Sequence, residues 1–294
     1  MKKKKGINVL SLFDGVSIAQ QALEELNIPI NNYFASEIDK NATKVTNHHF
    51  PNTIQLGDVR NISGEDLPPI QILIFGSPCQ SLSILKFQRQ GLSSEDSGLF
   101  YEALRLLKEI KPTYFLMENV GSMSQTDRGT ITKLLGAEGI SINSNLVSGQ
   151  NRNRIYWTNI PGVRVPNDKE ILLKNIIVDG YVDRNKSNCV LTKNVSHTKK
   201  GLIRYLTKSI GQVVFLDKDF TALPKKEKLK QVESIDDQTA KSIFRLFTVE
   251  ELEKLQTLPV GYVSSLLKKT PCTHAIGNGF TLEVIKSILA NAKF

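Results

Sequence analysis

Cysteine is scarce in this sequence, since the 294 residues contain only Cys79, Cys189 and Cys272. The three are far apart and odd in number, and no Cys-x-x-Cys pair occurs. This spacing argues against a disulfide framework and against a zinc site, so no metal cofactor is expected. Such cysteine usage favours a reducing, cytoplasmic setting.

Long apolar runs are also missing. No stretch approaches the roughly 20 apolar residues that span a bilayer, so no membrane partner is expected. A basic start, 2–5, precedes the apolar run 6–13, which is too short for a secretory signal and has no small-residue cleavage site after it. The hydrophobic content of 40% and charged content of 23% are those of an ordinary globular protein.

Positive charge is unevenly distributed. The net charge is +9, of which residues 2–5 contribute four and residues 161–240 a surplus of five. The rest of the chain is balanced. A basic excess confined to one segment is typical of a module that binds a polyanion such as nucleic acid.

The first 160 residues alternate between strand-like and helix-like patterns. This alternation predicts a mostly parallel α/β sheet with helices on both faces, in which ligands bind at the carboxyl ends of the strands. The predicted strands are 7–12, 33–36, 54–56, 70–75 and 114–117, and the predicted helices are 18–26, 40–48 and 99–110.

The pattern changes after Pro161. Residues 161–240 are polar and rich in Lys and Asn, with short strand-like pieces such as 212–216, and helical spacing returns at 247–258 and 282–290. We therefore predict a large domain formed by 1–162 and 243–294, and a second, smaller domain at 163–242.

Acidic residues follow three of the predicted strands. Asp14 stands beside Gly15, which permits a tight turn and close approach of the backbone to a ligand. Glu37 lies near the ~20-residue offset at which an acid binds ribose hydroxyls in nucleoside-binding folds. Asp58 follows the third strand. Because no GxGxxG motif is present, a cofactor with adenosine but no pyrophosphate fits better than a dinucleotide.

Further reactive side chains lie at later strand ends. Cys79 follows the strand 70–75 in a Gly-Ser-Pro-Cys-Gln loop, where a cysteine can be an exposed nucleophile, although a lone cysteine is also common as a small buried hydrophobe. Glu118 follows the strand 114–117. Gln150, Arg152 and Arg154 alternate, so on a strand they would share one face. The alternative interpretation of this pattern is a charged edge strand without a role in catalysis.

Together these motifs resemble those of the DNA cytosine-5 methyltransferases, with some stretches similar to the eukaryotic de novo branch and others to bacterial and viral enzymes. The resemblance covers roughly 7–162 and 243–292. It implies a Rossmann-like S-adenosylmethionine-dependent methyltransferase fold, with 163–242 as the target-recognition domain. The motifs are Phe13-Asp14-Gly15, Pro78-Cys79-Gln80, Glu118-Asn119-Val120, Gln150/Arg152/Arg154 and Gly277-Asn278-Gly279.

The resemblance implies a covalent mechanism on a cytosine in double-stranded DNA. Cys79 would add to C6 of the base, and Glu118 would protonate or hydrogen-bond N3. Arg154 would contact O2, and Arg152 would help to organise the catalytic loop. The base must be flipped out of the duplex, at a cost of a few kcal/mol.

By the same resemblance the cofactor is S-adenosyl-L-methionine, which becomes S-adenosyl-L-homocysteine. Phe13 would stack on its adenine, Glu37 would bind its ribose, and Asp58 with Val59 would hold the adenine edge. The remaining implied cofactor residues are Asp14, Gly15, Pro78, Leu99, Asn278 and Phe280. Gly279 departs from the small polar residue more usual in the family, so no side-chain bond is expected there.

The implied DNA contacts lie mainly in the loop 81–96. Lys86 and Arg89 would bind phosphates, and Leu85 would either wedge into the base stack or pack internally. Ser83 and Gln150 complete the expected DNA-binding set. The sequence identifies neither the DNA sequence recognised, nor the oligomeric state, nor a partner restriction endonuclease.

Three alternative functions have sequence signatures of their own. An RNA cytosine-5 methyltransferase of the transfer-RNA type shares these motifs, but its Cys-Phe-Thr signature is poorly matched by Cys189-Val190-Leu191-Thr192. A silent DNA-binding regulator would be expected to lack the nucleophile or the acid, and both are present. An amino-methyltransferase needs an Asp/Asn/Ser-Pro-Pro-aromatic motif, which the sequence lacks.

Overall fold

A computed structural model describes residues 6–76 and 98–294 of the chain. The chain divides into two compact units. The first comprises Met1–Ile142, Asn153–Pro166 and Leu282–Phe294, and the second comprises Asn143–Arg152 and Asn167–Thr281. These units are defined by packing alone, and the functional division at 162 and 242 remains a prediction.

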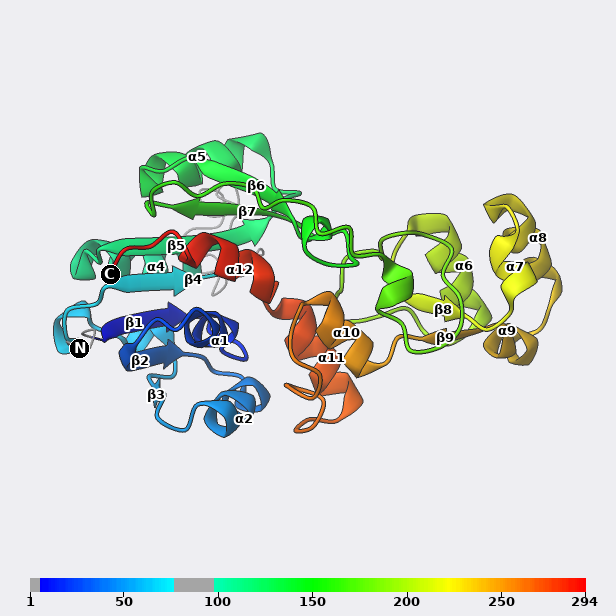
Figure 1. The fold of residues 1–294 in the computed structure, drawn as a ribbon, viewed down its shortest axis with the longest axis horizontal. Coiled ribbons are helices and arrows are strands. Elements are labelled where there is room, and N and C mark those ends of the chain that lie inside the picture. Colours follow the sequence, from blue (N-terminus) through cyan, green and yellow to red (C-terminus); the bar gives the residue numbers. More distant parts are fainter. Residues whose placement is uncertain (1–5, 77–97) are drawn as a thin grey trace. The chain divides into compact units, whose positions relative to one another are not determined.

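A seven-stranded sheet forms the centre of the first unit, in the order β3-β2-β1-β4-β5-β7-β6 (Figure 1). The strands β1 to β5 pair in parallel, whereas β7 is antiparallel to β5. The mostly parallel α/β sheet predicted from the sequence is therefore confirmed. The strands are β1 (Ile7–Leu12), β2 (Ile30–Ser36), β3 (Ile54–Gln55), β4 (Ile72–Phe75), β5 (Tyr114–Val120), β6 (Gly139–Asn143) and β7 (Asn153–Thr158).

The strand order reverses between β1 and β4. The chain moves outward from β1 to β2 and β3, then returns to the other side of β1 at β4. In open α/β sheets such a reversal leaves a crevice outside the carboxyl ends of the two strands, and ligands bind there. The carboxyl ends of β1 and β4, at Leu12 and Phe75, therefore lie at the expected ligand site.

Helices of the first unit begin at local capping signals. Asp39 accepts a hydrogen bond from the backbone N–H of Asn41 at the start of α2, and Ser124 accepts one from Asp127 at the start of α5. The helices are α1 (Ile18–Glu25), α2 (Lys40–His49), α4 (Leu99–Ile110), α5 (Gln125–Leu135) and α12 (Leu282–Leu289), with the 3₁₀ turns η1 (Val59–Asn61) and η2 (Gly64–Asp66).

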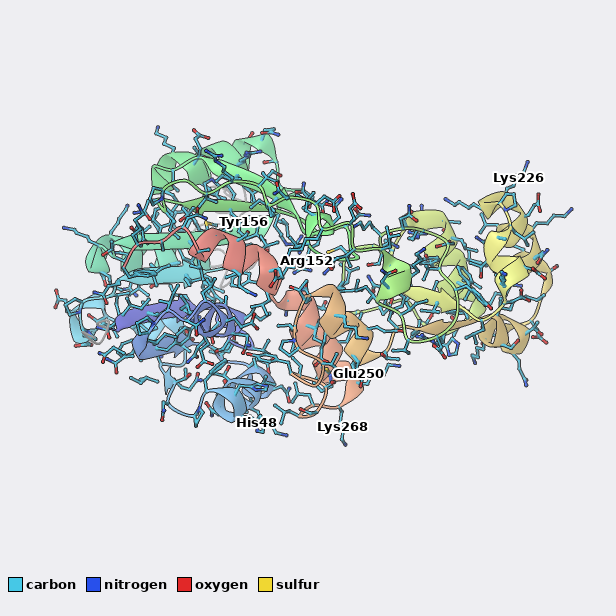
Figure 2. The ribbon with its side chains drawn as sticks, viewed as in Figure 1. His48, Arg152, Tyr156, Lys226, Glu250 and Lys268 are labelled. Atoms are coloured by element: carbon cyan, nitrogen blue, oxygen red, sulfur yellow. The ribbon has the colours of Figure 1, made fainter. Side chains whose placement is uncertain are left out.

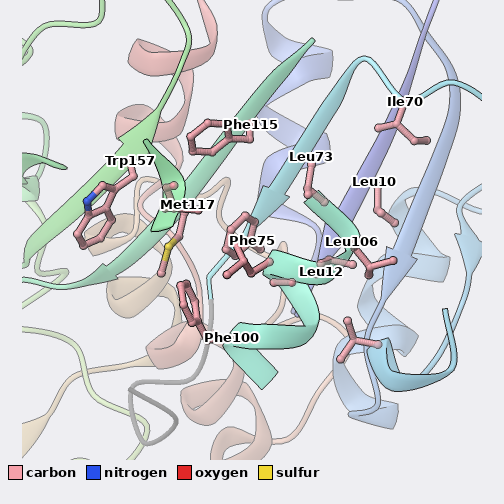
Figure 3. Close-up of a cluster of buried hydrophobic side chains, with 14 of the residues drawn as sticks. Leu10, Leu12, Ile70, Leu73, Phe75, Phe100, Leu106, Phe115, Met117 and Trp157 are labelled. Carbon is pink, nitrogen blue, oxygen red and sulfur yellow. The ribbon is translucent and has the colours of Figure 1, made fainter. Parts of the chain in front are cut away.

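One face of the sheet carries a large apolar core. Alternate residues of β1 and β4, such as Leu12 and Phe75, point to this face and are almost fully buried. Figure 3 shows Phe100 and Leu106 of α4 beside them. Since each fully buried side chain of this size contributes about 1.5–3 kcal/mol, the core fixes the strand ends firmly.

The second unit contains several short helices and a small antiparallel sheet of β8 (Val213–Phe215) and β9 (Phe244–Leu246). Its helices are α6 (Lys199–Lys208), α7 (Lys218–Ala222), α8 (Lys225–Ser234), α9 (Asp237–Ile243), α10 (Val249–Leu255) and α11 (Lys269–Asn278), with the 3₁₀ turns η5 (Ser144–Leu146) and η6 (Leu173–Asn175). A separate apolar cluster includes Leu202, Tyr205, Phe215 and Phe244.

Four helices of this unit, α6 to α9, lie where the sequence predicted only irregular structure and short strands. The reason is clear in α8, which buries only Lys228 and Val232 and so has no apolar stripe. Within 6–76 and 98–294, none of the helices has the length and apolar character needed to cross a membrane.

Candidate active site

The loop after β1 is tightly turned. Phe13, Gly15 and Ser17 all have a positive φ, at 55°, 60° and 55°. Among residues 6–76 and 98–294, no atom lies within 4 Å of a Cβ atom added at Gly15, so these residues leave the space beside this glycine open. The loop therefore brings backbone to the edge of the crevice.

Asp14, within this loop, has a buried side chain. Its Oδ1 accepts a hydrogen bond of 2.8 Å from the hydroxyl of Tyr33, and its Oδ2 accepts one from the hydroxyl of Ser17. Burial raises the pKa of Asp14 to about 6, although hydrogen bonds from Ser11, Ser17 and Tyr33 oppose the shift. The negative charge of Glu37 raises this pKa further. The Asp14 carboxyl group thus holds the loop in place through these hydrogen bonds.

Glu37 directly follows β2, as predicted, and its carboxylate is fixed by backbone groups. It accepts hydrogen bonds of 2.8 Å from the N–H groups of Gly15, Ile38 and Asp39. These bonds join the loop after β1 to the end of β2. The carboxylate is therefore held in one orientation beside the open space at Gly15.

Asp58 follows β3 and caps η1. It accepts a hydrogen bond of 3.0 Å from the N–H of Arg60 and forms a salt bridge of 2.6 Å with the guanidinium of the same residue. The hydrogen bond from the Arg60 side chain is the main reason why the pKa of Asp58 is lowered. The side chain of Val59 is part of the core, and Leu99 packs partly buried against it.

Ile38 is not among the site residues predicted from the sequence. Its side chain is 73% exposed, although it follows the buried end of β2 directly. A large apolar residue in this position, next to Glu37, offers a surface on which a flat ring can rest. The signal in the sequence was an isoleucine between two acidic residues at a strand end.

Glu118 and Arg154, predicted as catalytic residues, come together in the structure. In the antiparallel pairing of β5 and β7, Glu118 lies opposite Tyr156 and Val120 lies opposite Arg154. The two side chains are thus diagonal neighbours on one face of the sheet. Arg154 Nε lies 2.9 Å from Glu118 Oε1, and the side chains are only 14% and 12% exposed.

The expected alternation of Gln150, Arg152 and Arg154 along one strand is wrong, because β7 begins only at Asn153. Arg152 (Figure 2) is buried in the second unit. Its guanidinium donates hydrogen bonds to the carbonyl oxygens of Val190 at 3.0 Å, Gly277 at 3.1 Å and Gly279 at 2.9 Å. Arg152 therefore joins two distant segments of the chain.

Gln150 is completely buried in the same unit. Its amide nitrogen donates to the carbonyl of Leu255 and, at 2.8 Å, to Oε1 of Gln256, while its own Oε1 accepts a bond of 3.1 Å from the N–H of Val190. In this structure the side chain has no exposed surface to offer to DNA. It stabilises the interior of the second unit instead.

The remaining described candidates, Asn278 and Phe280, belong to the second unit, where Asn278 is the exposed last residue of α11 and Phe280 is partly buried. Gly277 before them is needed for close packing. A Cβ atom at this position would lie 2.5 Å from the backbone of Leu191 and Thr192.

Six predicted site residues lie outside the described residues: Pro78, Cys79, Ser83, Leu85, Lys86 and Arg89. Across 6–76 and 98–294 there is no cluster of His, Cys, Asp and Glu that could hold a metal ion. Cys189 and Cys272 are free thiols, and burial raises the pKa of Cys272 to about 12.

Comparison with known proteins identifies related sequences. A family model described as C-5 cytosine-specific DNA methylase matches residues 7–293. The orphan methyltransferase M.Rho11sI of Bacillus phage rho11s is 32% identical over 206 residues, which cover 66% of this chain and 39% of that protein. The type II methyltransferase M.Bsp6I of Bacillus sp. (strain RFL6) is 34% identical over 162 residues, or 51% of each. The chain thus spans about half the length of these curated relatives, or less.

Two solved structures show the same fold. A mutant DNMT2 of Spodoptera frugiperda matches with a TM-score of 0.72 at 18% identity, covering 97% of this chain and 99% of that one. The Dnmt2 methyltransferase of S. pombe matches with a TM-score of 0.71 at 15% identity, covering 97% of both chains. At such low identity the likeness concerns the fold alone.

Proposed function

Since the chain belongs to the C-5 cytosine-specific DNA methylase family, we propose that it transfers a methyl group from S-adenosyl-L-methionine to carbon 5 of a cytosine in double-stranded DNA. The main support from the structure is the pair of Glu118 and Arg154, joined at 2.9 Å where β5 and β7 run side by side. A carboxyl group and a guanidinium held together can contact the N3 and O2 edge of one base.

The strand ends of β1 and β2 fit the nucleoside part of this cofactor. Glu37 is fixed in one orientation beside the open space at Gly15, as ribose hydroxyls require. We assign the adenine to Phe13 and to the exposed Ile38. Asp58 with Val59 takes the adenine edge, and Pro78, Leu99, Asn278 and Phe280 complete the proposed pocket. When bound, S-adenosyl-L-methionine supplies the methyl group and leaves as S-adenosyl-L-homocysteine.

The protein's first chemical task is to make C5 nucleophilic. We assign this task to Cys79, whose thiolate forms a bond to C6 and breaks the aromaticity of the ring. Electron density then moves toward N3 and O2. Glu118 protonates or hydrogen-bonds N3, and Arg154 hydrogen-bonds O2, so both stabilise the developing charge.

The second task is to restore the ring after C5 carries the methyl group. C5 loses its proton to water, the electron pair forms the C5–C6 double bond again, and the bond between C6 and Sγ of Cys79 breaks. The target base must first be flipped out of the duplex. Ser83, Leu85, Lys86 and Arg89 are the proposed DNA contacts of the loop that follows Cys79.

The basic segment 163–242 is the proposed target-recognition domain, since its surplus of positive charge suits the DNA backbone. Arg152 positions the segments at 190 and 277–279 and is proposed to act on catalysis only indirectly. The lack of paired cysteines supports a cytoplasmic setting.

A cross-linking experiment tests the reaction. Duplex DNA with 5-fluorocytosine at the target site has no C5 proton to lose, so with cofactor present the protein should remain bonded to it under denaturing conditions. Cys79→Ser should form no such complex, whereas Cys272→Ser, a change at a buried thiol of the second unit, should cross-link normally. Methylation by a folded Cys79→Ser protein at the original rate, or of transfer RNA in place of DNA, would contradict the proposal.

A further inference from the structure

An open cavity of about 680 Å³ lies within the second unit, and none of its lining residues is a site residue assigned above. Its lining includes the loop 177–185 and, from α7, Lys218, Thr221 and Ala222. The cavity is large enough to admit the edge of a nucleotide base. It belongs to the basic segment that the sequence singled out, so its charged residues are of particular interest.

The loop 177–185 is held rigidly. Tyr181 exchanges two backbone hydrogen bonds of 2.8 Å with Phe215, and the N–H of Val178 donates to Glu251 Oε1 at 2.9 Å. Gly180 has a φ of 81°, and a Cβ atom there would lie 2.6 Å from the carbonyl oxygen of Phe215. The side chains of Val178 and Tyr181 nevertheless remain 62% and 42% exposed. A rigid backbone that presents exposed side chains is typical of a recognition surface.

Arg184 lines this cavity with its side chain locked in one position. The guanidinium stacks over the ring of Tyr205 at 4.5 Å, Nε donates to Asp183 Oδ1 at 3.0 Å, and Nη1 donates to Asn188 Oδ1 at 2.7 Å. A guanidinium has five N–H donors. The bonds to Asp183 and Asn188 take two of them, and the hydroxyl of Tyr205 also interacts with the guanidinium. The side chain is only 26% exposed, so it is fixed in one orientation and presents a preoriented fork of further N–H donors.

The surroundings of this fork favour an anionic or electron-rich ligand. Lys174 and Lys218 also line the cavity, and neither forms a salt bridge with any residue that the structure describes. One acid of the cavity, Asp179, is paired with Arg245. The other, Asp183, is the residue bonded to the arginine. The charge left without compensation is therefore positive.

We propose that Arg184 is a specificity-determining residue that reads a guanine in the DNA recognised by this protein. The two acceptors O6 and N7 on the major-groove edge of guanine match the fork of an arginine. A phosphate can also accept from an arginine fork, but its oxygens are not confined to one plane. The stacking on Tyr205 fixes the plane of the fork, which suits the coplanar acceptors on the edge of a base. This inference rests on the proposed function and names a residue that selects its substrate.

The test compares Arg184→Lys and Arg184→Gln with the original protein on a library of duplexes randomised at each position around the cytosine. Both binding and methylation are measured, and the protein is expected to prefer guanine at one position at least. Lysine keeps the charge but not the fork, so this preference should fall by roughly 5- to 150-fold in both variants. The matched control is Lys226→Ala on α8 (Figure 2), an exposed lysine whose loss should leave the preference unchanged.

Two results would overturn the inference. The first is a guanine preference that survives in Arg184→Lys, or that is absent from the original protein. The second is an equal loss of affinity for all duplexes with a shallower salt dependence, which indicates a phosphate contact. Unchanged thermal unfolding and cofactor binding show that Arg184→Lys is folded. Because duplex selection by binding needs no catalysis, it tests Arg184 even if no duplex is methylated, in which case the proposed function fails separately.

Discussion

Asp14 should make the stability of the protein depend on pH in an unusual direction. Carboxyl groups in folded proteins often have a lowered pKa, but burial raises that of Asp14 from 3.8 to about 6. The protonated form is therefore favoured by folding. Asp14→Asn places a neutral group of the same shape at this position. Its amide oxygen can still accept the hydrogen bond that Tyr33 donates to Oδ1.

The sign and size of the effect follow from the shift. The stability that Asp14 contributes is fully present below pH 3.8 and is lost as the pH rises through 6, because ionisation is harder in the folded state. A difference of this size corresponds to roughly 3 kcal/mol in full, of which about 2 kcal/mol falls between pH 4.5 and 8. Asparagine does not ionise, so the variant escapes this loss.

The assay is urea unfolding of both proteins at a series of pH values. We expect the free energy of unfolding of Asp14→Asn, relative to the original protein, to rise by about 2 kcal/mol from pH 4.5 to pH 8. Tyr33→Phe removes a donor to the carboxylate and should move the midpoint of this pH dependence upward. A difference between Asp14→Asn and the original protein that stays constant over the whole range would refute the reasoning.

Five further substitutions test other parts of the structure. Glu37→Ala should weaken S-adenosyl-L-methionine binding by about 1.5–3 kcal/mol in calorimetry, whereas unchanged affinity in a folded protein would exclude the ribose contact. Glu118→Gln and Arg154→Ala should each lower the methylation rate at least tenfold. Because the two side chains touch, the loss of transition-state stabilisation in the double variant should be smaller than the sum of the two single losses. Fully additive losses would contradict a joint role. Glu253→Gln should lower unfolding stability by about 1.5–3 kcal/mol, because its buried carboxylate accepts three backbone N–H bonds and a hydroxyl. Gly277→Ala should lower the melting temperature, since its Cβ would lie 2.5 Å from backbone atoms, and an unchanged melting temperature would contradict that close approach.

Much of the first unit could be predicted from the sequence, because its strands are apolar runs with sharp ends. The prediction for α4, 99–110, agrees with the structure at both ends, since its apolar residues recur with helical spacing and Pro112 follows. Asp14, Glu37 and Asp58 stand just past β1, β2 and β3, as expected. Their roles toward a cofactor remain predictions.

Other features depend on contacts that no local pattern reveals. Gln150 and Arg152 alternate as strand residues do, yet they turn inward to bond Leu255, Val190 and Gly277, far away in sequence. Glu251 looks like an ordinary exposed helix residue. It is completely buried, because Arg245 and two backbone N–H groups satisfy its carboxylate.

The position of α12 has a consequence for the order in which the protein can fold during synthesis. This helix packs against α1 in the first unit, and Lys286 forms a salt bridge of 2.8 Å with Glu25. Residues 167–281, which separate it from the sheet strands, belong to the second unit. The ribosome thus makes all of the second unit before the first unit can close over α1. Until residue 289 is made, the apolar side chains of α1 that α12 contacts lack this partner, so a chaperone that binds apolar surface would find its target there.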